Sequence, residues 1–140
     1  MTAEAVLVAA GPLVALLNRS ERQHDWVKAR LGELAPPLLT CEAVLAEAAY
    51  LLRRIDPGAR ALMALLERRA IRLAFQLHEH QDPVARLMAK YADVQMSLAD
   101  ACLVRMAELH SRARVLTLDQ DFSVYRRNGR QVVPTLAPPA

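Results

Sequence analysis

The residues of this sequence best suited to chemistry are carboxylates near the ends of predicted elements. Asp119 and Asp121 directly follow a short apolar segment, in Thr117-Leu-Asp-Gln-Asp-Phe122. Asp100 lies in the first turn of a predicted helix that is apolar nearly all round, and such a helix is largely buried. An ionised carboxylate there is unfavourable unless it is paired or binds a cation. A functional carboxylate at position 100 is therefore favoured.

Each of these aspartates also has a structural interpretation. Asp119 or Asp121 can cap a short turn before Phe122, and for either residue taken alone the cap is favoured. Asp100 can complete a capping box, Ser97-x-x-Asp100, at the start of its helix. The capping and the functional roles of Asp100 are compatible.

Two glutamates lie on the helix predicted after the second strand. Glu42 and Glu47 are five residues apart, which separates them by about 140° on a helical wheel. They flank the apolar stripe of this helix from opposite sides, so at most one of them faces a given site. The alternative for either residue is an ordinary solvated glutamate, which is the commoner case for a lone Glu.

The elements that must position these side chains follow from short apolar segments, helical periodicity and breakers. Strands are predicted at residues 5–8, 38–40, 71–75 and 115–118, with a short fifth strand at 132–133. Helices are predicted at residues 13–17, 21–34, 41–54, 56–69, 83–91 and 97–111. Thr40 and Asp56 are predicted to cap the helices that follow them, and the residues from Leu136 onward are predicted to be a frayed tail.

Short apolar strands separated by helices predict an α/β fold. Its three layers are a central, mainly parallel sheet of four to five strands and helices on both faces. Ligands of such sheets bind outside the carboxyl ends of the strands. The residues after Val8, Thr40 and Leu118 are therefore where chemistry is expected.

Composition favours one domain over residues 1–140, with an aliphatic core and a cytosolic location. The hydrophobic fraction is 54%, yet no apolar run approaches the roughly 20 residues that span a bilayer, and no signal peptide is evident. Only two of the 18 basic residues are lysines, but a net charge of +3 is too small to demand a nucleic-acid partner. Cys41 and Cys102 are predicted to be reduced packing residues.

The order of these features resembles the PIN-domain ribonucleases, in particular the bacterial toxin branch called virulence-associated protein C. The matching segments are Leu7–Val14, Leu45-Ala-Glu47, Leu98-Ala-Asp-Ala101 and Leu116-Thr-Leu-Asp-Gln-Asp-Phe122. Each motif is weak alone, but four in this order are fairly specific. The resemblance implies that Glu47, Asp100 and Asp119 hold one or two Mg²⁺ or Mn²⁺ ions, with Asp121 as an auxiliary residue. Glu42 has no counterpart in the family's acidic motifs.

One expected carboxylate is missing. The family's first acidic residue ends the first strand, in a pattern like V-D-x-G-P, and here Ala9 takes its place in Val8-Ala-Ala-Gly-Pro12. Alanine cannot bind metal or orient water, so this chain is expected to be inactive or severely impaired. Two explanations stay open: an engineered replacement in a toxin, and a natural, degenerate member kept for binding. Close relatives also often carry an acidic residue where Ser97 stands.

The resemblance also implies partners. The parent function is a metal-dependent endoribonuclease toxin of a type II toxin–antitoxin pair, which hydrolyses phosphodiester bonds of RNA as a homodimer. An antitoxin segment with a basic side chain is expected to cover the acidic groove. The alternative is a catalytically dead PIN domain that binds RNA or protein. Arginines that could guide RNA phosphates past the carboxylates are Arg19, Arg22, Arg112, Arg114 and Arg126.

Overall fold

A five-stranded parallel sheet is the centre of the fold. The computed structural model describes residues 4–139. The strand order is β3-β2-β1-β4-β7, and all four pairings are parallel. The strands are β1 (Val6–Val8), β2 (Leu38–Thr40), β3 (Ile71–Leu73), β4 (Arg114–Leu116) and β7 (Thr135–Leu136). The predicted α/β fold is confirmed.

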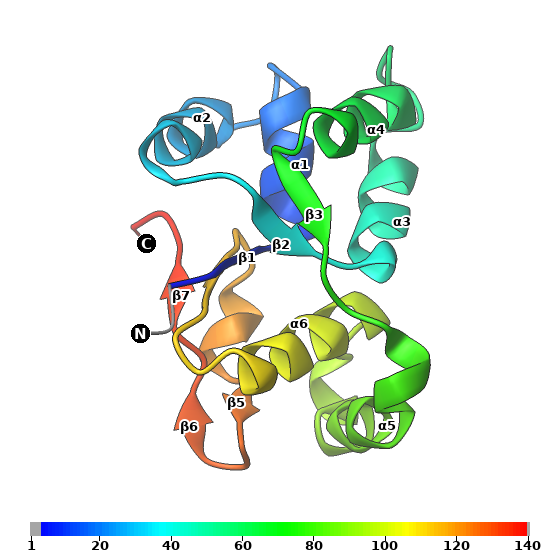
Figure 1. The fold of residues 1–140 in the computed structure, drawn as a ribbon, viewed down its shortest axis with the longest axis vertical. Coiled ribbons are helices and arrows are strands. Elements are labelled where there is room, and N and C mark those ends of the chain that lie inside the picture. The colour runs from blue at the N-terminus through cyan, green and yellow to red at the C-terminus, as the bar shows by residue number, and fades with distance from the viewer. Residues whose placement is uncertain (1–3, 140) are drawn as a thin grey trace.

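Helices cover both faces of this sheet (Figure 1). In that view α1, α2 and α4 lie above the sheet, and α5 and α6 lie below it. The helices are α1 (Ala10–Leu17), α2 (His24–Glu33), α3 (Glu42–Leu51), α4 (Ala59–Glu67), α5 (Gln81–Lys90) and α6 (Leu98–Leu109). Three short 3₁₀ turns complete the set: η1 (Leu77–His80), η2 (Ala92–Val94) and η3 (Gln120–Ser123).

The central strand β1 and its neighbour β4 are buried on both faces. Leu7, Val8, Val115 and Leu116 are each at most 1% exposed. Each strand has only three residues, and such apolar runs are typical of parallel strands covered by helices. The neighbouring strand β2 is tied to the end of β1 because the Thr40 hydroxyl donates a hydrogen bond to the Val8 carbonyl at 3.0 Å.

Two predicted caps are wrong. Cys41 occupies the N-cap position of α3, while Thr40 belongs to β2 and its hydroxyl is used by Val8. Asp56 does not cap α4; it forms an exposed ion pair with Arg60 at 3.0 Å. Gly58 precedes α4 with φ of 60°, where an added Cβ would lie 2.8 Å from the Ile55 carbonyl oxygen. Helix α4 therefore begins after a tight turn at Gly58 and has no side-chain cap.

The fifth strand of the sheet, β7, reaches into the residues from Leu136 onward that were predicted to be a frayed tail. The Thr117 N–H donates to the Leu136 carbonyl at 3.1 Å, which pairs β4 with β7. The strand predicted at 132–133 instead belongs to a separate antiparallel hairpin of β5 (Arg126–Arg127) and β6 (Gln131–Val132). Its connection, residues 128–130, includes two residues with positive φ, Asn128 at 52° and Gly129 at 83°. Two-residue strands leave too little periodicity to be distinguished from a tail.

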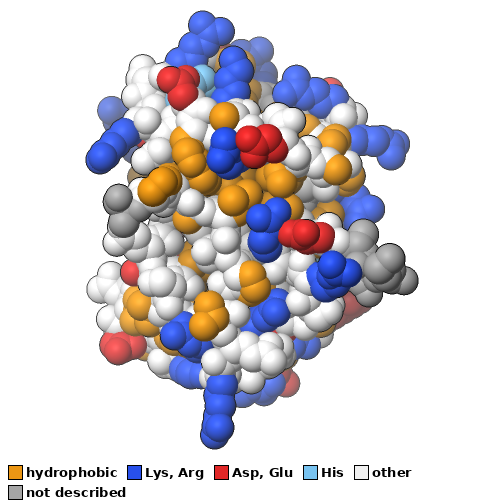
Figure 2. Space-filling model, turned by 90° about the vertical axis from the view of Figure 1, so that its left-hand side faces the viewer, with side chains coloured by type: hydrophobic (Ala, Val, Ile, Leu, Met, Phe, Trp, Pro, Cys, Tyr) orange, Lys and Arg blue, Asp and Glu red, His pale blue; other side chains and the backbone are white. Residues whose placement is uncertain are grey.

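The surface charge forms no single stripe on the face shown in Figure 2, where Lys and Arg side chains are spread from top to bottom. Hydrophobic side chains gather mainly in the upper half of that face. Within residues 4–139, no helix has the length and apolar character needed to cross a membrane.

Candidate active site

A pocket of about 400 Å³ lies at the carboxyl ends of β1 and β4. This is the end of the sheet at which a ligand was expected. Three carboxylates enter it from different elements: Glu47 from α3, Asp100 from α6 and Asp119 from the segment after β4. We call it the acidic pocket; its lining residues are Ala9, Ala10, Gly11, Glu47, Asp100, Thr117, Leu118, Asp119, Gln120 and Phe122.

Ala9 lies where β1 meets the acidic pocket. Its backbone N–H donates to the Leu116 carbonyl at 3.1 Å, which continues the pairing of β1 with β4 by one residue. The residue is 6% exposed. Gly11 packs closely nearby, since a Cβ there would lie 3.4 Å from Leu118 Cβ. Because Ala9 lines the acidic pocket, a carboxylate at position 9 would stand in the same pocket as the other three.

Asp119 both caps a turn and lines the acidic pocket. Its Oδ1 accepts a hydrogen bond from the Asp121 N–H at 2.9 Å, at the start of η3. Its own N–H donates to Thr117 Oγ1 at 3.0 Å, so the turn after β4 is fixed on both sides of this residue. The predicted cap is thus present and leaves Asp119 Oδ2 available. The Asp121 side chain is not part of the pocket lining.

Asp100 is held at the start of α6 by two hydrogen bonds. Its N–H donates to Ser97 Oγ at 3.0 Å, which confirms Ser97 as the N-cap. Its Oδ2 accepts a hydrogen bond from the Tyr125 hydroxyl at 3.0 Å. Burial, followed by the charges of Asp119 and Glu47, raises the pKa of Asp100 from 3.8 to about 6, against the opposing effect of Tyr125. The carboxylate is therefore placed where a proton or a cation stabilises it.

Glu47 stands at the exposed rim of the acidic pocket. Partial burial raises its pKa, and the negative charge of Asp119 adds to this effect. Glu42 lines a different pocket, next to Cys41 and Leu98. The two glutamates thus face different sites, as their separation around the helix predicts.

Comparison with known proteins identifies the fold family. Residues 6–128 match the PIN domain. The chain belongs to the PIN domain family. A similar solved structure is that of VapC20 from Mycobacterium tuberculosis, described as a Sarcin-Ricin loop cleaving toxin, with a TM-score of 0.77 and 21% identity over 86% of this chain and 94% of that chain. At this identity the likeness establishes the fold. A search of curated proteins found no match.

The donor set of this PIN domain suits Mg²⁺ or Mn²⁺ in kind, because hard cations prefer carboxylate oxygens. The described lining of the pocket contains no Arg, Lys or His side chain that would neutralise these carboxylates. Among residues 4–139, however, no group of three or more His, Cys, Asp or Glu side chains is arranged to hold a metal ion. Mg²⁺ commonly keeps several waters and binds through one or two carboxylates. The residues present therefore fit an ion that keeps most of its water.

Tyr125 is the site residue that sequence reasoning missed. It is fully buried, and its ring packs edge-on against Phe122 and Tyr91 with centroids 5.1 and 5.2 Å apart. Burial, together with the charge of Asp100, raises the pKa of its hydroxyl, so the hydroxyl remains a donor. The residue lies outside every regular element, where periodicity carries no information. The one signal in the sequence is an aromatic residue three positions after the acidic motif that ends in Phe122.

The arginines proposed to guide RNA do not surround the acidic pocket. Its described lining contains none of Arg19, Arg22, Arg112, Arg114 and Arg126. Arg114 begins β4, at the opposite end of that strand, and forms an ion pair with Glu4. Arg126 donates to the carbonyls of Ser123 and Tyr125, at 2.8 and 2.9 Å, and so fixes the segment that follows η3.

Proposed function

We propose that this PIN domain is a metal-dependent endoribonuclease of the toxin type, in which Ala9 leaves the chain inactive or severely impaired. The observation that carries the proposal is the convergence of Glu47, Asp100 and Asp119 on one pocket whose wall contains Ala9. RNA as the substrate is supported by the similar VapC20 structure, described as a Sarcin-Ricin loop cleaving toxin.

Hydrolysis of a phosphodiester needs a nucleophilic water and stabilisation of charge on the leaving oxygen. A bound Mg²⁺ or Mn²⁺ would supply both effects. Asp100 and Asp119 are the residues proposed to hold it, with Glu47 as a further ligand at the exposed rim. Tyr125 keeps one oxygen of Asp100 in place by its hydrogen bond, and leaves the other oxygen free of this contact. Asp121 is proposed to act as an auxiliary residue, because its N–H positions the Asp119 carboxylate.

Ala9 removes one negative charge and one oxygen donor from this pocket. It stands at the carboxyl end of the central strand β1, and the acidic residues in the described lining of the pocket are Glu47, Asp100 and Asp119, which come from other elements. The remaining carboxylates would bind a metal ion weakly and would position the attacking water poorly. The inactivity of this chain is thus proposed to be local, with the fold intact.

The reversion Ala9→Asp tests this proposal. In the presence of Mg²⁺ or Mn²⁺ the variant should cleave a structured RNA at a rate at least about a hundredfold above that of the present chain. In EDTA its cleavage should stop. Ala9→Asn is the matched control, because the asparagine side chain has nearly the size of aspartate but carries no charge. A second control, Ala9→Asp with Asp100→Asn, should remove the gained activity.

Two results would count against the nuclease. Equal rates for the present chain and the Ala9→Asp variant would show that position 9 is not the lesion. Absence of cleavage by both chains, with retained RNA binding, would favour the second candidate function, an inactive PIN domain that binds RNA or protein. That candidate is supported by Ala9 and by the lack of a three-residue metal group among the described residues.

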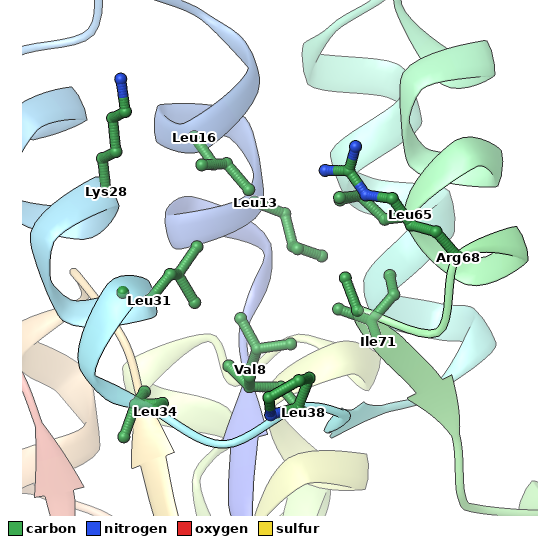
Figure 3. A pocket seen from close by; sticks show the side chains of 13 residues that line it. Val8, Leu13, Leu16, Lys28, Leu31, Leu34, Leu38, Leu65, Arg68 and Ile71 are labelled. Atoms are coloured by element: carbon green, nitrogen blue, oxygen red, sulfur yellow. The ribbon is translucent and has the colours of Figure 1, made fainter.

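An antitoxin partner is proposed as part of the same function. An apolar pocket of about 330 Å³ lies between α1, α2 and α4 (Figure 3). Its walls are formed by apolar side chains such as Leu13, Leu31 and Ile71, and the exposed cations Lys28 and Arg68 lie at its rim. This combination suits an apolar anchor flanked by acidic side chains. A basic side chain of the same antitoxin is proposed to cover the acidic pocket.

Pairing of the chain with an antitoxin makes a simple prediction about its gene. A neighbouring gene for a small DNA-binding protein would support a type II pair acting in the cytoplasm, with the toxin as a homodimer, and its absence would favour the inactive module. We further propose that residues 1–140 form a single PIN domain, because β7 lies beyond the matched residues 6–128 yet completes the sheet.

A further inference from the structure

A second polar pocket, of about 310 Å³, lies between α5, α6 and the β5–β6 hairpin. In Figure 1 these elements form the lower part of the molecule. We call it the basic pocket; its lining residues are Pro83, Arg86, Leu87, Lys90, Arg105, Glu108, Arg126, Asn128 and Gly129. None of them lines the acidic pocket.

The basic pocket has an excess of positive charge. Four of its residues are Arg or Lys, and Glu108 is the one acidic residue in its described lining. Both oxygens of Glu108 are already used. Oε1 accepts from Arg105 Nη1 at 3.1 Å, and Oε2 accepts from the Asn128 N–H at 2.6 Å. The other cations of the pocket therefore have no carboxylate within it to pair with.

The protein itself holds most of these cations in place. Arg126 Nη1 donates to backbone carbonyls of residues 123–125, and Lys90 Nζ donates to the Gly129 carbonyl at 3.1 Å. These bonds leave the Nη2 of Arg126 and part of the ammonium group of Lys90 able to donate further. Arg86 is exposed on α5, and within residues 4–139 its guanidinium forms no ion pair, so it would gain most from a bound anion.

One short segment connects the basic pocket with the acidic pocket. Gln120 and Phe122 of η3 line the acidic pocket, and the carbonyl of Ser123, at the end of the same turn, is bound by Arg126. Tyr125 contacts Asp100, while its neighbour Arg126 lines the basic pocket. The linings of the two pockets are therefore joined by only a few residues, 120–126.

We propose that the basic pocket binds a backbone phosphate of the RNA strand whose scissile bond lies in the acidic pocket, a few nucleotides from that bond. This inference rests on the proposed function. Guanidinium and ammonium groups are suited to phosphate, and a repeated phosphate backbone is the anion that reaches both sites at once. Arg86, Lys90, Arg105 and Arg126 would then be positioning residues, which fix the register of the strand without touching the reacting atoms.

The test measures RNA binding by fluorescence anisotropy with the present chain in EDTA, so that no cleavage interferes. Two probes are compared: a dinucleotide, and a single-stranded oligonucleotide long enough to cross both pockets. The double variant Arg86→Ala with Lys90→Ala should weaken binding of the long probe about tenfold. The slope of log K against log salt should fall by about 0.7 for each phosphate of the single strand that the variant no longer neutralises. Dinucleotide binding should not change.

The matched control is Arg60→Ala, which removes an exposed arginine of α4 that pairs with Asp56. It should leave both the affinity and the salt slope unchanged. Arg86→Lys should restore most of the affinity that Arg86→Ala removes, because it keeps the charge. Circular dichroism and thermal unfolding of every variant will show whether the fold is retained; the exposed Arg86 side chain is not needed to hold α5 in place.

Different failures separate the two proposals. If the present chain binds the long RNA and the double variant binds it equally well with the same salt slope, the basic pocket does not contact RNA and this inference is wrong. The inference is also wrong if the double variant keeps its affinity for the long RNA and loses affinity for a protein partner. If the present chain binds no RNA at any low salt concentration, the proposed function itself fails.

Discussion

At the scale of single residues, Asp100 is placed between opposing influences. Its burial and the charges of Asp119 and Glu47 favour the protonated form, whereas the hydrogen bond from the Tyr125 hydroxyl favours the ionised form. The pKa rises to about 6, so burial and the neighbouring charges outweigh the hydrogen bond. At neutral pH the chain therefore carries an ionised carboxylate that is less stable than it would be in water. A cation in the acidic pocket would remove this penalty.

The raised pKa of Asp100 predicts how stability depends on pH. The folded chain binds the Asp100 proton more tightly than the unfolded chain. Its contribution to stability is therefore fully present below pH 4 and is lost as the pH rises through about 6. Asp100→Asn should raise the free energy of unfolding at pH 7.5 by about 1 kcal/mol, after allowance for the solvent that still reaches the half-buried carboxylate. Urea unfolding at pH 4 and pH 7.5 measures the difference.

At pH 4 the gain from Asp100→Asn should nearly disappear, since the wild-type carboxylate is then largely neutral. Glu42→Gln is the matched control, because this carboxylate is exposed and lies outside the acidic pocket. It should change stability by less than about 0.5 kcal/mol at either pH. A destabilised Asp100→Asn variant at pH 7.5 would contradict the prediction and would assign Asp100 a mainly structural role at the start of α6.

The carboxylates could be found from sequence, but their partners could not. Asp100 and Asp119 are conspicuous because each stands at the edge of an apolar segment, where a charge is unexpected. Tyr125 gives no such signal, since a tyrosine in an irregular segment has no preferred neighbour. Its contact with Asp100 depends on how the segment after η3 folds back against α6. Long-range packing of this kind is not encoded in local spacing.

At the scale of elements, apolar runs and periodicity identified what short-range rules specify. Strand β2 was predicted with its observed bounds, and Ser97 was predicted as the cap of α6. The caps at Thr40 and Asp56 were wrong because tertiary contacts compete for the same side chains, such as the hydrogen bond from Thr40 to Val8. The edge strand β7 was missed because two residues carry no period.

Strand β7 is expected to stabilise the segment that carries Asp119. Its Leu136 carbonyl accepts from the Thr117 N–H, and Thr117 Oγ1 in turn accepts from the Asp119 N–H. A chain that ends after Pro134 should lose about 1–2 kcal/mol of unfolding free energy, since it loses this bond and the packing of Leu136. Hydrogen exchange of the Thr117 amide should also accelerate. Thermal unfolding and amide exchange measure the two effects.

The control for this truncation is a chain that ends after Leu136, which keeps the β4–β7 pairing. It should unfold at the temperature of the full chain. Equal losses from both truncations would mean that the last residues, and not the pairing of β7, account for the effect. No change in either chain would show that β7 contributes nothing to the stability of the sheet.

At the scale of the whole molecule, the parallel sheet explains why distant residues meet. Ala9, Glu47, Asp100 and Asp119 are spread over more than a hundred positions, yet all of them line one pocket. Parallel strands bring their carboxyl ends to one edge, and the helices that follow begin there. The order of the motifs predicted this convergence, but the apolar pocket beside α1, α2 and α4 and the basic pocket depend on helix packing and have no linear motif. They could not have been predicted from the sequence.

The link between fold and metal can be measured without any nuclease assay. In EDTA at pH 7.5, Ala9→Asp should be less stable than the present chain by about 1 kcal/mol, because it adds a like charge to a pocket that already holds three carboxylates. At a Mn²⁺ concentration one hundred times its dissociation constant, the variant should gain about 2.7 kcal/mol. The order of stability should therefore reverse when metal is added.

The present chain should gain much less from the same Mn²⁺ concentration, because it lacks the carboxylate at position 9. Adding Asp100→Asn to the Ala9→Asp variant should remove most of the metal-dependent gain while it relieves the repulsion seen in EDTA. NaCl at equal ionic strength controls for general screening of charge. If Mn²⁺ stabilised the present chain and the Ala9→Asp variant equally, position 9 would not belong to the metal site, and the impairment proposed for Ala9 would lose its physical basis.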